Sequence, residues 1–460
     1  MKIVLLTGLV FLFSLGIYSW VQSSRKAALL KKYQEDNGIY FSHDYPDWVF
    51  EYGLDVFVPE TSFLSFEVVT FKSDEEVEEF GQYFDFAKVK MLSFDGEEVT
   101  NKSIGYLKNL NSVSMMDITS TQINDEGFQK LPPMPELVAI WLFNVQMSDD
   151  ALKGLEQFPK LEEVSFFEVK LTDTGISNLR NCKSLGSFTF DRVPLTEKGV
   201  LALAELPELV DLNLSHLEAD RISSQTFQAI CQHQELASLT LDLDFDKENL
   251  TLLTDLPNFN SLSLPDMELT DDDLATFSPL ANLENLELRG KTITSKGLGP
   301  LLLSSQLFSL GLREVPLTSE IIELLKEKKN LQILTIEGGI LDRETAQAMN
   351  GLKAEWLTLY FEKMNIEPGA LEALLSEKLF SDLQFQEIPL TVSDLETLRF
   401  LPENSSLSLT DMEITPEHLE VIKHLKQLAF LSLSSDSLSE QTEQELKTAL
   451  PNCQIYINLD

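Results

Sequence analysis

The chain has 460 residues, of which 43% are hydrophobic and 24% charged, and its formal net charge at pH 7 is −39. This composition is typical of a folded protein, because a disordered chain lacks the apolar side chains needed for a core. The excess of acid argues against nucleic-acid binding, which needs clustered Lys and Arg to displace counterions from phosphates. It favours a surface that keeps the protein dispersed, with a dock for a basic protein as the alternative.

The chain begins with a long uncharged stretch, residues 3–21. A helix needs about 20 apolar residues to cross a bilayer, and Tyr18 and Trp20 lie where an interfacial aromatic belt belongs. The length of the stretch and the missing A-x-A site favour a transmembrane anchor, residues 1–24, over a cleaved signal peptide.

The orientation of this anchor is open. Arg25, Lys26, Lys31 and Lys32 follow the apolar stretch, whereas only Lys2 and the amino terminus precede it. The positive-inside rule then places the rest of the chain in the cytoplasm. The lysine-then-apolar start also resembles a bacterial export signal, which would place the rest of the chain outside.

An internal repeat covers the remainder of the chain. Its unit is clearest in residues 161–179, LEEVSFFEVKLTDTGISNL, and the pattern returns in residues 185–203 and 283–301. The second residue of each apolar-x-apolar pair recurs mostly at intervals of 24 residues, at Val68, Phe94, Ile118, Leu142, Phe166, Phe190, Leu214, Leu241, Leu264, Leu288, Leu312, Ile336, Leu359, Phe385, Leu409, Leu433 and Ile457. We therefore predict about seventeen repeat units in residues 61–460.

Each unit combines a strand with a helix. Leu-x-Leu alternation places both apolar side chains on one side of a strand, and the spacing then becomes helical, as at Ile176 and Leu179. Helix N-caps are predicted at Thr172, Thr196, Thr270, Thr391 and Thr415. Because one unit cannot bury its apolar face alone, the units should stack into a parallel sheet with helices on the opposite side.

The pattern L-x-x-L-x-L-x-x-x-x-[LI]-T-[DE]-x-G-[LIV]-x-x-L resembles leucine-rich-repeat proteins, closest to the ribonuclease-inhibitor-like and cysteine-containing classes of bacterial repeats. The resemblance implies an α/β solenoid, a horseshoe with a concave parallel β-sheet and convex helices, that mainly binds proteins. One position departs from the family, because Val145, Val169 and Met267 replace the usual Asn or Cys. Without an asparagine ladder, we expect burial to contribute more of the stability. Cys182 and Cys453 match the cysteine-containing class and are expected to be small buried thiols.

The two ends of the repeat array need separate explanations. Residues 25–60 are predicted to form a helix and an aromatic cap over the first repeat, with a separate ligand site as the alternative. The chain ends on the strand-like residues 455–457 with no further helix. This edge is therefore either open or covered by an assembly partner, which would allow self-association.

No catalytic or cofactor motif is present. HExxH, G-x-S-x-G, P-loop and Rossmann patterns are all missing, and the three cysteines form no metal cluster. The acidic run Asp271–Asp273 follows an N-cap threonine, which favours compensation of the helix dipole over a calcium site. We therefore predict no enzyme activity, no cofactor and no metal.

The solvent side of the sheet is the expected binding surface. Its candidate partner-binding residues are aromatic, Arg and acidic: Trp141, Phe143, Phe167, Asp191, Arg289, Arg313, Trp356 and Tyr360. Aromatic residues and Arg dominate interface energetics. The alternative is that Phe143 and Phe167, which are 24 residues apart, pack on each other as an ordinary pair on a sheet surface.

The sequence thus predicts a membrane-anchored scaffold that binds a protein partner on the concave repeat face. A structural or adhesive cell-envelope protein that self-associates through the solenoid is the alternative. The family resemblance favours an extracytoplasmic solenoid, whereas the basic residues that follow the anchor favour the cytoplasm.

Overall fold

The computed structural model describes residues 25–33, 39–43, 64–276, 280, 282–353, 357–377, 380–435 and 437–458. The chain divides into two compact units, Met1–Asp220 and Arg221–Asp460. The predicted anchor, residues 1–24, lies outside the described residues. Within the described part of the chain, no helix has both the length and the apolar character that a membrane crossing requires.

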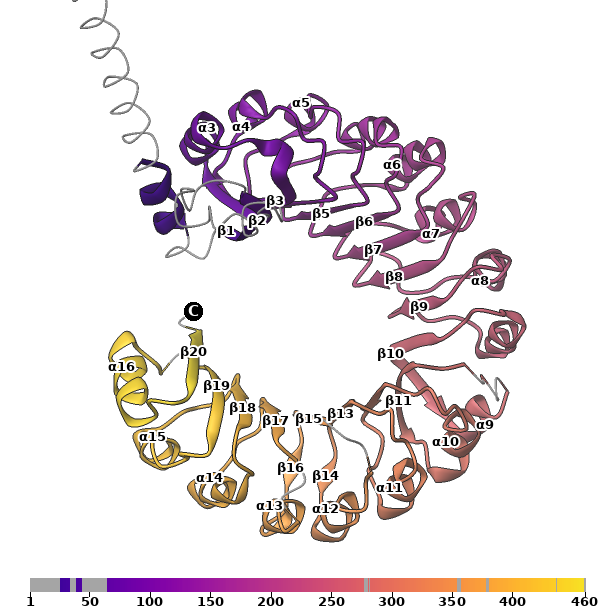
Figure 1. Cartoon of the computed structure of the whole chain (residues 1–460). Coiled ribbons are helices and arrows are strands. Elements are labelled where there is room, and N and C mark those ends of the chain that lie inside the picture. Colours follow the sequence, from indigo (N-terminus) through magenta and orange to yellow (C-terminus); the bar gives the residue numbers. More distant parts are fainter. Residues whose placement is uncertain are drawn as a thin grey trace, which may run out of the picture. The chain divides into compact units, whose positions relative to one another are not determined.

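In the first unit, one strand follows another in a single sheet (Figure 1). The strands are β1 (Ile39–His43), β2 (Leu64–Ser73), β3 (Val89–Glu98), β4 (Met115–Thr119), β5 (Ala139–Phe143), β6 (Glu163–Phe167), β7 (Ser187–Asp191) and β8 (Asp211–Ser215). Strand β1 is antiparallel to β2, and every later neighbour in this unit pairs in parallel.

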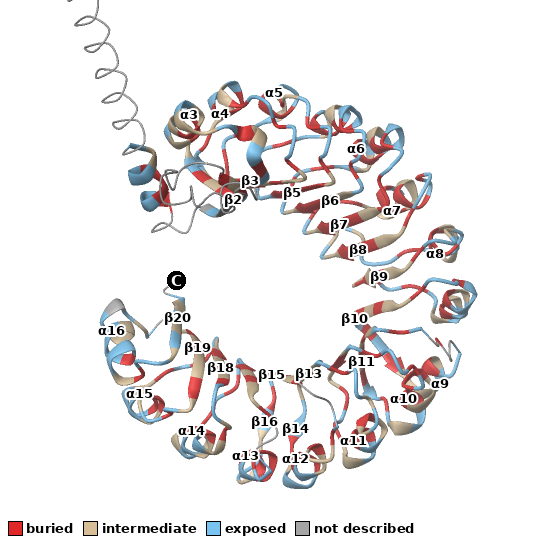
Figure 2. Cartoon of the chain, viewed as in Figure 1, coloured by how far each residue is buried: buried red, intermediate tan, exposed pale blue. Residues whose placement is uncertain are grey.

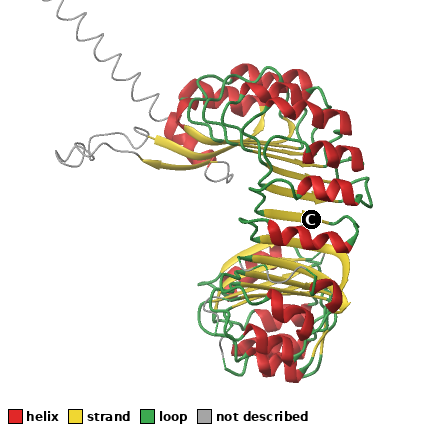
Figure 3. Cartoon of the chain, turned by 90° about the vertical axis from the view of Figure 1, so that its right-hand side faces the viewer, coloured by secondary structure: helices red, strands yellow, loops and turns green. Residues whose placement is uncertain are grey.

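Helices follow the strands of the first unit and lie along one side of the sheet (Figure 3). The α-helices are α3 (Asp74–Tyr83), α4 (Asn101–Tyr106), α5 (Asp125–Phe128), α6 (Asp173–Ile176) and α7 (Glu197–Ala204). The 3-10 helices are η1 (Phe86–Lys88), η2 (Ala151–Gln157) and η3 (Ser177–Asn181).

The second unit repeats this plan with parallel pairing throughout. Its strands are β9 (Ser238–Leu241), β10 (Ser261–Thr270), β11 (Asn285–Thr292), β12 (Ser309–Arg313), β13 (Ile333–Glu337), β15 (Thr358–Glu362), β17 (Asp382–Gln386), β18 (Ser405–Thr410), β19 (Leu428–Ser434) and β20 (Gln454–Asn458). The short strands β14 (Ile340–Leu341) and β16 (Asn365–Ile366) form a separate pair. The helices are α8 (Ser224–Ile230), η4 (Lys247–Asp255), α9 (Asp271–Leu274), α10 (Ser295–Leu301), α11 (Ser319–Leu325), α12 (Arg343–Met349), α13 (Ala370–Leu374), α14 (Val392–Thr397), η5 (Leu398–Phe400), α15 (Pro416–Ile422) and α16 (Glu440–Ala449).

The core of each unit lies between its strands and its helices (Figure 2). The alternation predicted from Leu-x-Leu is seen in β8, where Leu212 and Leu214 are buried and their neighbours are half-buried. The predicted N-caps are confirmed, because each threonine side chain accepts a hydrogen bond from the first turn of its helix, at Thr172, Thr196, Thr270, Thr391 and Thr415.

The predicted register of the first repeat is wrong. Phe71, and not Val68, pairs with Phe94, and Val69 pairs with Leu92. Phe71 is fully buried, whereas Val68 is half-buried. The error arises because β2 carries two overlapping apolar alternations, and only the second one continues into the next strand.

Aspartates at or near the start of a helix join several repeats to the next one. Asp173 accepts hydrogen bonds from the backbone N (2.9 Å) and the Oγ1 (2.6 Å) of Thr196, the N-cap of α7. A Cβ on Gly199 would lie 2.5 Å from Asp173 Oδ1, so the carboxylate occupies the space of the missing side chain. The same bonds join Asp149 to Thr172 and Asp271 to Thr294. We name this series of contacts the carboxylate ladder.

A second ladder forms at the ends of β4 to β8 and of β12, β15, β17 and β18. The chain turns there at a left-handed residue that is usually not glycine: Ser120, Asn144, Glu168, Arg192 and His216 in the first unit, and Glu314, Lys363, Glu387 and Asp411 in the second. The backbone N of Ser120 donates to the Phe143 O (2.9 Å), and that of Asn144 to the Phe167 O (2.8 Å). These backbone bonds, like the carboxylate bonds, pair polar groups of one repeat with the next in a chain that has no asparagine ladder.

Residues 25–33 form a helix that packs on the first repeat. Leu29, Leu30 and Tyr33 are buried, and Tyr33 Oη donates to the backbone O of Glu76 at 3.1 Å. Tyr40 in β1 is 60% exposed. The rest of the predicted aromatic cap, residues 44–60, lies outside the described residues.

Candidate functional site

The first unit brings three predicted residues together on the solvent side of its sheet. Trp141 and Phe143 lie in β5, and Phe167 lies beside Phe143 in β6. The rings of Phe143 and Phe167 stack with centroids 5.9 Å apart and planes at 29°. We name Trp141, Phe143 and Phe167 the aromatic patch. The stacking expected for an ordinary sheet pair is therefore present, yet 37% of Phe143 stays exposed to solvent.

Trp141 is held in place by a neighbouring carboxylate. Its Nε1 donates to Glu163 Oε1 at 2.8 Å, and Ser165 Oγ lies 3.5 Å from the same oxygen. A side chain that is fixed before binding loses little rotamer freedom when a partner arrives. The patch thus combines exposed aromatic area with a preset orientation.

A charged border follows the patch along the sheet. Asp191 pairs with Phe167 across β6 and β7, and its Oδ1 lies 2.8 Å from His216 Nδ1. Arg192 bonds to Glu168 at 2.6 Å and lies 3.8 Å from Asp191. Sequence reasoning missed Glu168, Arg192 and His216. These residues could have been found from their spacing, because they follow successive strands directly, at intervals of 24 residues.

Arg289 and Arg313 lie in the second unit, side by side in β11 and β12. Arg289 bonds to Glu314 (2.6 Å) and lies 3.6 Å from Asp266. Arg313 bonds to Glu287 (2.6 Å) and to Glu337 (3.0 Å). Both guanidinium groups are therefore engaged by carboxylates of the chain itself, which makes them a poorer source of new contacts than the aromatic patch.

The other predicted residues of the second unit are not part of this cluster. Tyr360 lies in β15 between Thr335 and Gln384 and is half-buried. Trp356 lies outside the described residues. A shallow hollow of about 200 Å³ lies over Gly311, where a Cβ would come within 2.9 Å of Glu287 Cγ.

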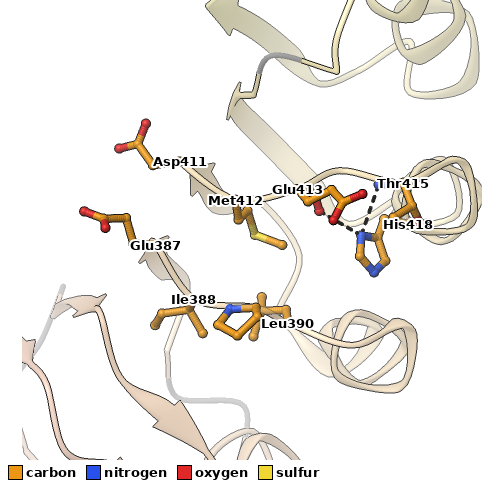
Figure 4. Close-up of a pocket in the computed structure, with 9 residues that line it drawn as sticks. Glu387, Ile388, Leu390, Asp411, Met412, Glu413, Thr415 and His418 are labelled. Carbon is orange, nitrogen blue, oxygen red and sulfur yellow. Dashed lines mark hydrogen bonds between the residues drawn. The ribbon is translucent and has the colours of Figure 1, made fainter.

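A larger cleft of about 500 Å³ lies in the second unit, at the turns that follow β17 and β18. Its lining includes Glu387, Asp411, Glu413, Met412 and His418 (Figure 4). No sequence motif indicated this cleft, because its residues belong to two turns and a helix and match no known motif.

The described residues contain no group of three or more His, Cys, Asp or Glu side chains placed to hold a metal ion. Asp271 and Asp273 have structural partners, because Asp271 bonds to Thr294 and Asp273 completes a capping box with Thr270. Burial raises the pKa of the Cys231 thiol to about 12 and that of Cys182 to about 11. Neither buried thiol is therefore suited to act as a nucleophile.

No protein-family model matches the chain, and no curated protein shows significant similarity to it. Among solved structures, an internalin from Listeria monocytogenes is 18% identical, with 89% of each chain covered and a TM-score of 0.33. A leucine-rich-repeat protein from Leptospira interrogans is 18% identical over 84% of this chain and 99% of its own, with a TM-score of 0.37. TLR13 in a complex with ssRNA13 is 16% identical over 81% of this chain and 64% of its own, with a TM-score of 0.41. The repeats of the present chain consist of a strand, a turn and a helix, and the strands of successive repeats pair in parallel. This is leucine-rich-repeat architecture.

Proposed function

We propose that the chain is a protein-interaction scaffold and that the aromatic patch contacts its protein partner. The observation that carries this proposal is the exposure of stacked aromatic rings on the solvent side of the sheet, beside a tryptophan fixed by Glu163. Aromatic side chains bury a large area with few rotatable bonds, which is why they dominate interface energies. The border formed by Asp191, Arg192 and Glu168 supplies the polar rim that usually surrounds such a patch.

Site-specific photo-crosslinking in intact cells tests this proposal. Benzoylphenylalanine at position 143 replaces one aromatic ring by another and should form an adduct with one protein. Phe308 is the matched control, because it is 39% exposed, close to the 37% of Phe143, and lies outside the patch. Trp141→Ala should reduce the adduct at position 143 while leaving the thermal melt nearly unchanged. Equal adducts at both positions would contradict the proposal.

Membrane attachment through residues 3–21 is part of the same proposal. It is supported by the uncharged stretch, by the aromatic residues at its end and by the missing cleavage site. Alkaline extraction of cell membranes should leave the full chain in the pellet, and a topology reporter fused after Asp460 should identify its side. Release of the chain by alkaline carbonate would contradict attachment by a spanning segment.

The alternative function, a structural protein that self-associates, is favoured by one observation at β20. Ile455 and Ile457 are half-buried, whereas their partners in β19, Leu431 and Leu433, are fully buried. Tyr456 between them is 62% exposed. If copies associate here, light scattering should show a size that rises with concentration, and Ile457→Lys should abolish the rise. A size that is independent of concentration would contradict this alternative.

A further inference from the structure

The cleft of the second unit is formed by two successive turns. The loop of residues 387–390 follows β17, and the loop of residues 411–413 follows β18. Both loops begin at a left-handed residue, Glu387 (φ 51°) and Asp411 (φ 54°), whose side chains stand at the rim (Figure 4).

The cleft has an apolar floor and an acidic rim. Ile388, Leu390 and Met412 are at most 7% exposed and supply the floor. The carboxylates of Glu387, Asp411 and Glu413 are exposed. An apolar floor beneath carboxylates suits a side chain with an aliphatic stem and a cationic head.

The rim stays negative after its internal contacts are considered. Lys363 Nζ lies 3.4 Å from Glu387, but it also bonds to Glu362 (2.6 Å) and lies 3.6 Å from Glu337. One ammonium group is therefore shared by three carboxylates. Among the described residues, the donor to the Asp411 carboxylate is neutral, Gln386 Nε2 at 2.9 Å.

His418 adds a polar group at the back of the cleft. It is only 8% exposed, and its Nδ1 lies 3.3 Å from the Thr415 N and 3.2 Å from the Glu413 O. The Thr415 N–H donates to Nδ1 in a capping box, and Nε2 points away from Thr415 (Figure 4). The imidazole therefore serves the cap of α15, and the carboxylates of the rim are the groups that attract a cation.

We infer that this cleft receives a lysine or arginine side chain presented by a protein partner. The stem of that side chain packs on Ile388 and Met412, and its cationic head bonds to Glu387 and Asp411, whose carboxylates lie at the same end of the cleft (Figure 4). Arginine suits the site best, because its planar fork bonds two carboxylates at once. This inference rests on the proposed function in that a protein supplies the side chain.

Methyl NMR of the full-length chain tests the cleft directly. The chain has 10 methionines, so labelling their methyl groups with ¹³C yields a sparse spectrum in which Met412→Leu identifies the floor signal. The probe is N-acetyl-arginine amide, and N-acetyl-citrulline amide is its neutral counterpart. The arginine probe should shift the Met412 signal saturably, and the citrulline probe should not.

The matched variants separate local binding from general attraction to an acidic protein. Asp411→Asn combined with Glu387→Gln should weaken binding about fivefold or more, since two exposed ion pairs are lost. Asn tolerates the left-handed turn at position 411, so the fold is kept. Glu420→Gln on α15 is the control, because Glu420 is 66% exposed and pairs with Lys423; it should leave the titration unchanged.

Two outcomes overturn the inference: a Met412 signal that does not move, or equal affinity in the double variant and in Glu420→Gln. These outcomes differ from failure of the proposed function, which is read from the crosslink at position 143. Trp141→Ala should leave the Met412 titration unchanged, because the aromatic patch and the cleft use separate residues.

Discussion

Replacing Gly199 by alanine tests the carboxylate ladder through the sign of its effect. Gly199 lies in the first turn of α7 and has no positive φ, so helix propensity alone predicts that alanine stabilises it by about 1 kcal/mol. The new Cβ, however, would lie 2.5 Å from Asp173 Oδ1 and 3.2 Å from the Cβ of Leu195. The carboxylate must therefore move away from Thr196.

The size of the effect follows from the two bonds that Asp173 would lose. Hydrogen bonds to a charged group contribute roughly 1.5 to 3 kcal/mol each, and the lower end applies to a half-buried carboxylate. Loss of the backbone and Oγ1 bonds of Thr196, offset by the gain in propensity, yields a net destabilisation of about 1 to 2 kcal/mol. A matched control is Gly105→Ala in α4, where no atom lies within 4 Å of the new Cβ.

Urea unfolding followed by circular dichroism measures both changes, with midpoints compared at equal slope. The midpoint should fall for Gly199→Ala and stay or rise for Gly105→Ala. In an Asp173→Ala background the clash is gone, so Gly199→Ala should become stabilising. A midpoint for Gly199→Ala at or above that of the wild type would refute the reasoning.

Three further predictions concern ionisable groups. Burial acts to raise the pKa of Asp271, but hydrogen bonds from Thr294 outweigh it and hold that pKa below its ordinary value. The stabilisation by Asp271 is therefore present above the unfolded pKa and lost as the pH falls through the folded pKa. Urea midpoints of Asp271→Asn and wild type should differ near neutral pH and converge as the pH is lowered past the folded pKa, and a difference that does not change with pH would contradict this. Burial raises the pKa of Asp117, so the folded state disfavours the charged form of this carboxyl. The urea midpoint of Asp117→Asn should therefore equal or exceed that of the wild type, and a lower midpoint would contradict this. Mass spectrometry after brief iodoacetamide treatment should find Cys453 labelled before Cys231, because Cys231 is buried with a pKa of about 12, and the reverse order would speak against the described burial.

The positions of the strands and helix caps could be predicted because each has a local cause. Leu-x-Leu alternation determines which side of a strand is buried, and a threonine before a helical spacing is a cap wherever it occurs. The first repeat was misplaced because β2 offers two alternations, at Val68 and at Phe71, and only pairing with Phe94 selects between them.

The carboxylate ladder and the turn residues could not be predicted from local patterns. Asp173 contacts Thr196, 23 residues later, and each member already has a sufficient local explanation as a first-turn acid or an N-cap. The pairing of Arg289 with Glu314 was missed for a related reason. Glu314 stands at φ 53°, a conformation that glutamate rarely adopts, so its direction could not be inferred from spacing.

The candidate site, too, could be predicted only where it depends on the regular repeat. The aromatic patch was predicted because equal positions in successive strands must be neighbours. The cleft was not, because His418 and Asp411 belong to different structural elements and match no known motif. Such a site becomes visible only once the turns are placed beside one another.

The carboxylate ladder also has a consequence for the order in which the repeats fold during synthesis. In the carboxylate ladder the aspartate precedes the N-cap threonine that donates to it, as Asp173 precedes Thr196 and Asp271 precedes Thr294. During synthesis, which adds about 5 to 20 residues per second, the acceptor therefore leaves the ribosome before its donor. When a new helix forms, the carboxylate that its N-cap threonine bonds to is already present in the preceding repeat. The array can therefore fold from its amino-terminal end one repeat at a time.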